Sequence, residues 1–336
     1  MSSRPSADAP LISVVIPVRN EEETIPTLLA RLSDVFSGSG IAAEFVFVND
    51  GSTDNTMEVL ARQRMSDPRI ACVDLSRGFG KEIAITAGLQ HASGDAVVLI
   101  DADLQDPPEL IPRFVQLWRE GYDVVYGTRT HRKGESALKR ATAFLFYRVV
   151  EKVSQIRIPR DTGDFRLMSR RAVEALLQLP EQHRFMKGLF AWIGFPQISV
   201  PYVRDERAGG LTKFNYWRLW NFAIEGITSF STAPLKIATY LGFFIAVSAF
   251  AYALVIVWQK LMYDNPVAGY PSLMTALLFM GGVQLMTIGV LGEYVGRIFD
   301  ETKRRPLFLT RQFLPSNASG RNSASAPSGE SAGAVH

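Results

Sequence analysis

The sequence predicts an α/β protein in which a doubly wound, mostly parallel sheet precedes a pair of membrane-spanning helices. Before residue 121, short apolar runs alternate four times with stretches of helical apolar spacing. This alternation is typical of parallel strands joined by right-handed helical crossovers. Two uncharged segments, 237–259 and 265–292, follow later in the chain. Each can supply the roughly 20 apolar residues that an α-helix needs to cross a bilayer.

The individual elements are predicted from apolar periodicity and from the polar residues that interrupt it. The predicted strands of the first half are 11–17, 44–48, 70–75, 97–100 and 123–127. The predicted helices between and after them are 24–36, a stretch ending at Arg64, 82–91 and 110–120. Beyond residue 130 the pattern loosens, and we expect helices at 136–154, 170–179 and 184–192 and a strand at 197–203.

Composition and charge exclude several classes of protein. The 336 residues carry a net charge of +3, so nothing indicates a nucleic-acid-binding protein. Cys72 is the single cysteine, which excludes an internal disulfide, and its apolar neighbours indicate core packing rather than a nucleophile. The polar N-terminus lacks the apolar core of a signal peptide. We therefore expect the N-terminal domain to stay in the cytoplasm.

An apolar run that ends in alternating carboxylates is the feature around which the first half is organised. The run 97–100 predicts a fully buried strand, and Asp101 and Asp103 follow it directly. These two carboxylates and the amide oxygen of Gln105 form an all-oxygen set suited to Mg²⁺ or Mn²⁺. Asp and Pro also favour solvated turns, so a plain turn is the alternative for this motif taken alone.

Polar clusters follow each of the first four predicted strands. In chain order they are Pro17, Arg19 and Glu21; Asp50; Gly78, Gly80 and Lys81; and Asp101, Asp103 and Gln105. In a parallel sheet these ends meet at one edge, where open α/β sheets bind ligands. The chemistry suits a ligand with ribose hydroxyls and phosphates. The chain has no P-loop and no G-x-G-x-x-G after the first strand, so neither a P-loop ATPase nor a dinucleotide dehydrogenase is supported.

The two uncharged segments are joined by a short link, 260–271, and are therefore expected to form a hairpin. Basic residues flank this hairpin on both sides: Arg218, Lys236, Arg297, Lys303, Arg304 and Arg305. The positive-inside rule places both flanks in the cytoplasm and the link outside. Glu293 lies one helical turn before Arg297, and we expect these two side chains to pair.

Segment 211–230 mixes aromatic and charged side chains, which favours a helix lying in the membrane interface. A surface helix packed on the soluble domain is the alternative. The predicted parts of the chain are a disordered N-terminus 1–10, a cytosolic domain 11–210, interfacial helices 211–232, a transmembrane hairpin 233–300 with spans near 237–259 and 271–292, and a cytosolic tail 301–336 that is disordered after about 315.

Several motifs resemble those of the family-2 glycosyltransferases, which have the Rossmann-like GT-A fold. They are IPVRNEEE, FVNDGSTD, SRGFGKE, GDAVVLIDADLQDPPE, GDFRLMSRR, RFMKGLFAWIG and LGEYVGR, and the resemblance runs from about residue 11 to 308. Within this family the chain resembles the polyprenyl-phosphate glycosyltransferases of the dolichyl-phosphate mannose synthase type. The two-span C-terminus, GITSFSTAPLK and GYPSLM resemble the bacterial bactoprenol (undecaprenyl-phosphate) glucosyltransferase branch. One departure is Val18, where the family often has Tyr or Phe.

The resemblance implies roles for individual residues. It assigns the nucleotide sugar to Pro17, Val18, Arg19, Glu21, Asp50, Lys81, Asp101, Ala102 and Asp103, and the metal to Asp101, Asp103 and Gln105. It assigns the phosphate of the acceptor to Arg129, Arg204, Arg207 and Lys213, with attraction to lipid headgroups as the alternative for the last two. The implied catalytic residues are Asp103, Arg129 and Asp164, the last near the transferred sugar.

The implied reaction transfers a sugar, glucose from UDP-glucose in the bactoprenol branch, to a polyprenyl phosphate at the cytoplasmic face of the inner membrane. A phosphate monoester is already anionic at neutral pH, so positioning and charge stabilisation can carry most of the catalysis. A single displacement would invert the anomeric centre, with Asp164 either orienting a sugar hydroxyl or acting as a base. The resemblance also implies a Mg²⁺ or Mn²⁺ cofactor and a homo-oligomer such as a tetramer.

Other interpretations stay open on the sequence alone. The donor could be GDP-mannose, UDP-galactose, UDP-N-acetylglucosamine or a UDP-aminoarabinose derivative, because no residue decides the sugar or the base. A processive polysaccharide synthase is disfavoured by the two spans and by the absence of a Q-x-x-R-W segment. A non-catalytic nucleotide-sugar-binding partner of a lipid flippase, or a membrane-anchored scaffold, would not need the intact D-A-D-L-Q-D cluster.

Overall fold

The structure is a computed structural model of the whole chain, in which residues 10–130, 162–182, 184–203, 233–263 and 269–317 are described. Several sequence-based predictions lie outside the described residues, among them the disordered N-terminus and the disordered end of the tail. The others include the helix at 136–154, the aromatic segment 211–230, and the basic residues Arg204, Arg207 and Lys213.

The described residues form an eight-stranded sheet with the strand order β7-β5-β6-β4-β1-β2-β3-β8. The strands are β1 Leu11–Val18, β2 Ala42–Asn49, β3 Ile70–Leu75, β4 Ala96–Leu99, β5 Val124–Arg129, β6 Thr162–Ser169, β7 Gln197–Tyr202 and β8 Thr310–Leu314. Strands β1 to β4 run parallel to one another, so the predicted α/β fold is confirmed. Strands β6 and β8, which pair antiparallel with their neighbours, were not predicted from the sequence.

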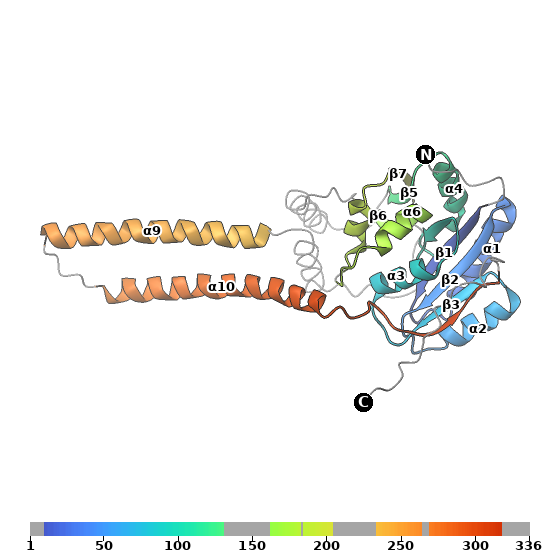
Figure 1. The fold of residues 1–336 in the computed structure, drawn as a ribbon, viewed down its shortest axis with the longest axis horizontal. Helices are drawn as coiled ribbons and strands as arrows, with labels where there is room; N and C mark the ends of the chain where they lie inside the picture. Colours follow the sequence, from blue (N-terminus) through green and yellow to red (C-terminus); the bar gives the residue numbers. More distant parts are fainter. Residues whose placement is uncertain (1–9, 131–161, 183, 204–232, 264–268, 318–336) are drawn as a thin grey trace, which may run out of the picture.

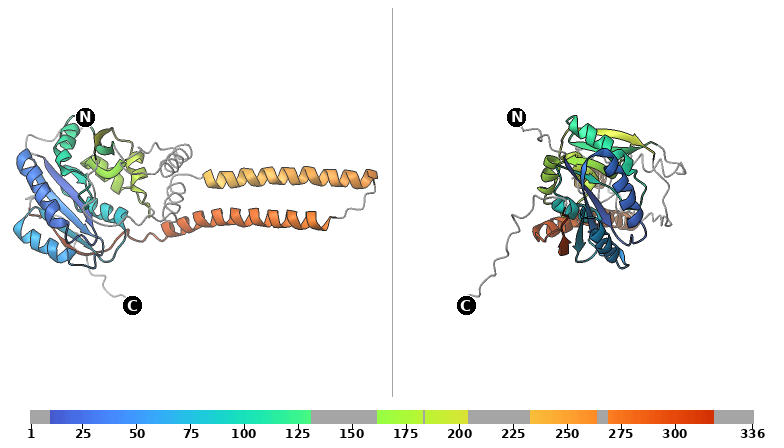
Figure 2. Two further views of the ribbon diagram at one scale, coloured as in Figure 1. Left: turned by 180° about the vertical axis from the view of Figure 1, so that it is seen from behind. Right: turned by 90° about the vertical axis from the view of Figure 1, so that its right-hand side faces the viewer.

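Helices cover both faces of this sheet, which makes it doubly wound (Figure 1; Figure 2). The helices are α1 Ile25–Ser39, α2 Thr56–Ser66, α3 Lys81–His91, α4 Ile111–Arg119, α6 Arg170–Leu177 and α7 Met186–Trp192. One apolar core joins the sheet to α1, α2 and α4, and a second core joins the opposite face to α3, α6 and α7. The parallel strands are buried on both faces, which explains why their sequences read as continuous apolar runs. Cys72 is buried among them, as predicted.

Helix α3 lies close against the centre of the sheet because it carries a glycine at the point of contact. A Cβ atom at Gly88 would lie 2.3 Å from Val15 Cγ1 and 3.0 Å from Val48 Cγ2. The N-terminus of α3 begins with Lys81, directly after Gly80. The close packing therefore fixes Lys81 at the edge of the sheet where β1, β2 and β4 end.

Two long helices, α9 Ala233–Tyr263 and α10 Tyr270–Thr302, extend side by side away from the sheet (Figure 1; Figure 2). Their segments Leu235–Gln259 and Ser272–Thr302 are long and apolar enough to cross a membrane, and their most apolar stretches are not buried by the rest of the chain. Helix α10 continues beyond the predicted span. Its Arg297 donates to Glu293 at 3.1 Å, which confirms the expected pair.

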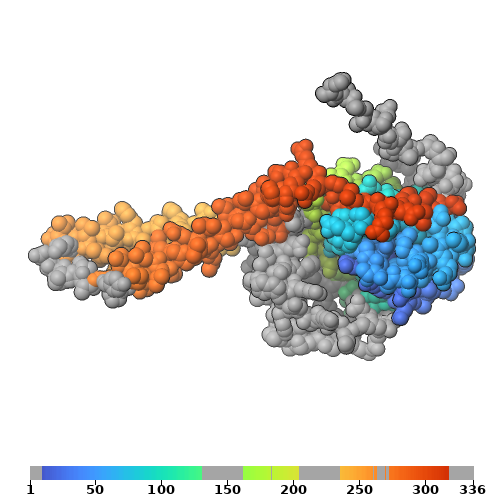
Figure 3. All heavy atoms as spheres, turned by 90° about the horizontal axis from the view of Figure 1, so that it is seen from below, coloured from blue at the N-terminus to red at the C-terminus, as the bar shows by residue number. Residues whose placement is uncertain are grey.

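After the hairpin the chain returns to the sheet. Strand β8 pairs with the edge strand β3, and Figure 3 shows this C-terminal segment in red along the blue and cyan part of the domain. Arg311 forms an ion pair with Asp74 at 3.3 Å, and Ser316 donates to the buried carboxylate of Glu44 at 2.7 Å. The end of α10 is also attached, because the backbone N–H of Gln182 donates to Glu301 at 2.8 Å. The domain therefore binds the part of the chain that follows the hairpin.

Candidate active site

A cavity of about 330 Å³ lies at the carboxyl ends of β1, β2 and β4, beside the start of α3. Its lining residues are Pro17, Val18, Arg19, Glu21, Asp50, Gly80, Lys81, Asp101, Ala102 and Asp103. All nine residues assigned above to the nucleotide sugar are among them, and the tenth, Gly80, belongs to one of the polar clusters noted at the strand ends. The parallel arrangement of β1 to β4 brings these distant segments together.

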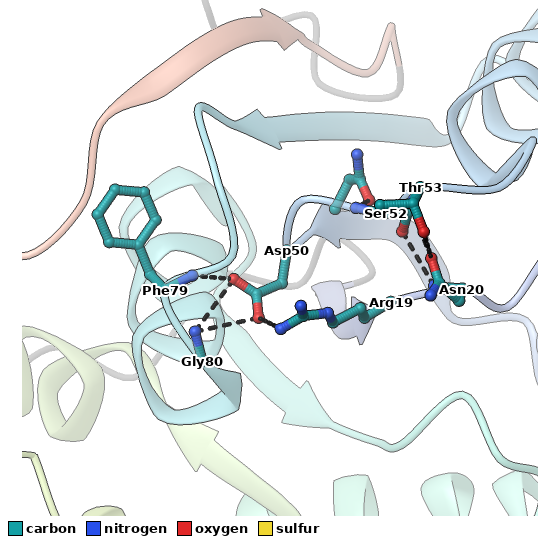
Figure 4. A network of polar contacts seen from close by, with 8 residues as sticks. Arg19, Asn20, Asp50, Ser52, Thr53, Phe79 and Gly80 are labelled. Carbon is teal, nitrogen blue, oxygen red and sulfur yellow. Dashed lines mark hydrogen bonds and ion pairs between the residues drawn. The ribbon is translucent and has the colours of Figure 1, made fainter.

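Asp50 forms the wall of the cavity at the end of β2, and its carboxylate organises the neighbouring loop. It accepts hydrogen bonds from the backbone N–H groups of Phe79 at 2.6 Å and Gly80 at 3.0 Å. Arg19 lies 3.8 Å from the same carboxylate (Figure 4). Asp50 is 4% exposed. The Asp50 carboxylate therefore holds the loop at Gly80 in place. Its role toward a base or a ribose stays a prediction.

The loops after β2 and β3 approach each other closely enough to require glycine at position 51. Gly51 has a φ of +65°, and a Cβ there would lie 2.3 Å from the backbone nitrogen of Gly78. A Cβ at Gly78 would lie 2.9 Å from Nη1 of Arg19. A side chain at Gly51 would therefore push the loops after β2 and β3 apart, whereas one at Gly78 would displace the end of the Arg19 side chain.

Lys81 connects two carboxylates that lie 63 residues apart in the chain. Its ammonium lies 2.7 Å from Asp101 and 2.5 Å from Asp164, which is on β6. Burial alone would lower the pKa of Lys81, but the two carboxylates raise it overall, so this side chain is a cation at physiological pH. Burial alone would raise the pKa of Asp164, but the positive charge of Lys81 lowers it overall. Asp164 is therefore ionised at neutral pH.

The two carboxylate oxygens of Asp164 differ, because Lys81 binds only Oδ2. Oδ1 of Asp164 is buried and has no hydrogen-bond partner among the described residues. A buried acceptor without a donor costs free energy, about 1–3 kcal/mol. Below it, the buried Arg166 donates to the carbonyl oxygen of Gly163 at 2.9 Å and lies 3.6 Å from the ring centroid of Phe190. These contacts hold the guanidinium of Arg166 against β6 and α7, and they do not involve Oδ1 of Asp164.

Only two of the three residues predicted to bind a metal line the cavity. Asp101 and Asp103 line the cavity, whereas Gln105 is not among the lining residues. The backbone N–H of Gln105 donates to Oδ1 of Asp103 at 3.2 Å, and Leu104 between them has a left-handed φ of 59°. No three His, Cys, Asp or Glu side chains in the described part of the chain lie close enough to hold a metal alone. Two carboxylates still fit Mg²⁺ or Mn²⁺, because such ions are commonly held by one or two carboxylates and the phosphates of a substrate.

Arg129 lies at the end of β5, the position that the resemblance assigns to the phosphate of the acceptor. A Cβ at Gly163 would lie 2.7 Å from Nη2 of Arg129, so the guanidinium lies directly against β6. Its Nε donates to the hydroxyl of Tyr202 at 3.4 Å, and that hydroxyl donates to Asp106 at 2.5 Å. Neither Tyr202 nor Asp106 was identified from the sequence. The third acidic residue of D-A-D-L-Q-D was the available signal for Asp106.

Glu82 and Lys187 are two further charged residues near Asp164 that the sequence did not indicate. Burial and the charge of Asp164 raise the pKa of Glu82 to about 7. Burial lowers the pKa of Lys187, which Asp164 partly opposes. The site therefore contains several opposite charges in a partly desolvated volume, where electrostatic interactions are stronger than in water.

Comparison with known proteins agrees with this fold. Residues 13–177 match the family described as Glycosyl transferase family 2, and residues 233–298 match the GtrB C-terminal hairpin. The fold and the site define a glycosyltransferase of the GT-A type. The chain belongs to glycosyl transferase family 2, because it matches the model of this family and is about half identical to curated glycosyltransferases over 89% of its length.

Among these relatives is an uncharacterized glycosyltransferase of Synechocystis sp., 53% identical over 89% of this chain and 94% of that protein. Another is a bactoprenol glucosyl transferase of Shigella phage SfV, 49% identical over 89% of this chain and 98% of that protein. Among solved structures, a mannosyltransferase from Pyrobaculum calidifontis in complex with GDP-Man and Mn²⁺ is 18% identical, with a TM-score of 0.47 over 88% of each chain.

Proposed function

We propose that this protein transfers a sugar from a nucleotide-sugar donor to the phosphate of a polyprenyl phosphate at a membrane surface. The observation that carries the proposal is the cavity at the sheet edge, where Asp101, Asp103 and Lys81 meet and Asp164 lies beside them. The same chain continues into two helices long and apolar enough to span a bilayer. Relatives named bactoprenol glucosyl transferase support a polyprenyl acceptor.

The proposed donor is UDP-glucose and the proposed acceptor is undecaprenyl phosphate. An oxygen of the acceptor phosphate attacks the anomeric carbon of the sugar. The bond from that carbon to the nucleotide diphosphate breaks, and the diphosphate leaves with the electron pair. Attack from the opposite face inverts the anomeric centre. No proton needs to be removed, because the acceptor is already an anion, so the protein mainly positions the reactants and stabilises charge.

Each charged residue of the site has a proposed part in this reaction. Arg129 binds the phosphate of the acceptor and reduces its repulsion from the diphosphate. Asp164 accepts a hydrogen bond from a sugar hydroxyl through its unpartnered Oδ1. Lys81 holds Asp164 and offers positive charge to the diphosphate. Asp101 and Asp103 would hold Mg²⁺ or Mn²⁺, which supplies charge stabilisation for the departing diphosphate.

The proposed location is the cytoplasmic membrane, with two spans and with the catalytic domain and both termini in the cytoplasm. The basic residues that flank the hairpin support this orientation. A long isoprenoid chain stays in the bilayer, because each buried CH₂ contributes about 0.8 kcal/mol. The enzyme must therefore meet the phosphate at the interface. The homo-oligomer that the resemblance implies stays a prediction.

The test is a transfer assay with the purified full-length protein in lipid nanodiscs that contain undecaprenyl phosphate. Radiolabelled UDP-glucose is compared with GDP-mannose, UDP-galactose, UDP-N-acetylglucosamine and a UDP-aminoarabinose derivative. We expect a β-linked, metal-dependent lipid product, and a loss of about 100-fold or more in Asp103→Ala. Asp34→Ala, which removes an exposed carboxylate on α1, is the matched control. An α-linked product, or full activity in Asp103→Ala, would contradict the proposal.

A further inference from the structure

Tyr202 is the last residue of β7 and stands directly opposite Arg129 of β5 in the sheet register. Its ring is fixed on two sides. It meets the ring of Phe165 edge to face at a centroid distance of 6.0 Å, and a Cβ at Gly127 would come within 2.7 Å of it. Tyr202 is 5% exposed. The hydroxyl of this ring is therefore held in one place.

The direction of the hydrogen bonds at this hydroxyl follows from the groups around it. The hydroxyl has one hydrogen, which it donates to Oδ1 of Asp106 at 2.5 Å. Burial and the Asp106 carboxylate raise the pKa of Tyr202 to about 12, so the phenol keeps its hydrogen at physiological pH. The oxygen is then oriented with its lone pairs toward Nε of Arg129, which donates to it at 3.4 Å. The contact does not use the terminal amino groups of Arg129, which are the groups suited to a phosphate.

Asp106 connects this pair to the loop at the cavity. It is 1% exposed and ends the same short loop that carries Asp101 and Asp103. Its second oxygen, Oδ2, is buried and has no hydrogen-bond partner among the described residues. A buried carboxylate with so few donors is costly, and the contact to Tyr202 is the one that the structure describes for it. Burial of the Asp106 carboxylate is thus unfavourable by itself, and its hydrogen bond holds Tyr202, which in turn contacts Arg129.

We propose that Asp106 and Tyr202 are positioning residues, which fix the guanidinium of Arg129 where it meets the phosphate of the lipid acceptor. The inference rests on the proposed function, because it assigns the acceptor to Arg129. It adds a physical link between the donor side of the cavity, at Asp101 and Asp103, and the acceptor side. A long arginine side chain that is held by its inner nitrogen loses less conformational freedom when it binds a phosphate.

The test compares Tyr202→Phe with the full-length wild type in the nanodisc assay. We expect the KM for undecaprenyl phosphate to rise by about tenfold, which is the loss of one hydrogen bond to a charged group. The KM for the nucleotide sugar should stay within about twofold. Tyr122 precedes the first residue of β5, at the end of the strand away from Arg129. Tyr122→Phe removes its hydroxyl and should leave both KM values unchanged. An unchanged acceptor KM in Tyr202→Phe would overturn the inference.

Two further comparisons separate positioning from a general structural effect. Asp106→Asn keeps an acceptor oxygen for Tyr202 and should recover most of the acceptor affinity that Asp106→Leu loses. In an Arg129→Ala background, Tyr202→Phe should have no further effect on the acceptor KM, because its influence passes through Arg129. Equal loss in both Asp106 variants, or an additive double mutant, would overturn the inference. Absence of transfer by the wild type would instead overturn the proposed function.

Discussion

At the scale of single residues, Lys81 is the side chain on which the charge balance of the site depends. Its ammonium lies between Asp101 and Asp164, so its removal leaves two carboxylates facing each other without a cation. We expect Lys81→Met to reduce kcat/KM by about 100-fold, because the variant lacks the positive charge that faces both the diphosphate and Asp164. The measurement is initial-rate kinetics with varied donor. Lys187→Met is the matched control for loss of a neighbouring lysine, and equal losses in both variants would contradict a specific role for Lys81.

Glu82 gives a prediction about stability. Its folded-state pKa of about 7 lies above the ordinary value of 4.5, so the folded protein binds more protons than the unfolded chain between these values. The contribution of Glu82 to stability is therefore lost as the pH rises from about 4.5 to 7, by at most about 3 kcal/mol. Glu82→Gln should melt at a higher temperature than the wild type at pH 8, and the gain should shrink toward pH 5.

Thermal unfolding of both proteins in detergent, followed by tryptophan fluorescence at pH 5 and pH 8, measures this difference. Glu58→Gln, at an exposed position on α2, is the control and should shift the melting temperature equally at both pH values. A gain in Glu82→Gln that is independent of pH would show that the amide stabilises the protein for another reason.

At the scale of elements, β8 protects the edge of the sheet. Without β8, strand β3 would present unpaired backbone groups, which favour aggregation. We expect a chain that ends before Thr310 to unfold at a markedly lower temperature and to aggregate, because it also loses the bonds from Arg311 and Ser316. A chain that ends after Asn317 keeps these contacts and is the control. Gel filtration and thermal unfolding compare the two, and equal behaviour would show that β8 is dispensable.

The elements that sequence analysis identified and those it missed differ in a physical way. Strands β1 to β4 are buried on both faces and show uninterrupted apolar runs, so their prediction succeeded. Strand β6 contains Asp164 and Arg166, whose burial depends on Lys81 and on Phe190, partners that are far away in the sequence. Strand β8 is a short, largely exposed edge strand. Its pairing depends on β3, more than two hundred residues earlier, which no local pattern reveals.

The candidate site shows the same division. Residues at the ends of parallel strands could be grouped from sequence because the topology brings those ends together. Gln105 was grouped with them through the D-A-D-L-Q-D motif. It is not among the residues lining the cavity, and its part in metal binding stays a prediction. Tyr202 was missed because its partners, Asp106 and Arg129, come from other strand ends.

At the scale of the whole molecule, the orientation of the hairpin can be tested by cysteine labelling. Cys72 is buried, and burial raises the pKa of its thiol to about 12, so the native cysteine reacts poorly near neutral pH. An impermeant maleimide should label Asn265→Cys, between α9 and α10, in intact cells. Asp34→Cys on α1 should react only after permeabilisation. Labelling of Asp34→Cys in intact cells would reverse the proposed orientation.

Strand β8 also has a consequence for how the protein is made. Strands β1 to β7 leave the ribosome before the hairpin does, but the strand that completes the sheet at β3 follows α10 in the chain. Folding of the catalytic domain can begin during synthesis, yet its outer edge stays open until both apolar helices have been produced. Any delay in membrane insertion should therefore prolong the time during which β3 is exposed, and chaperones that cover open strands would be needed most in that interval.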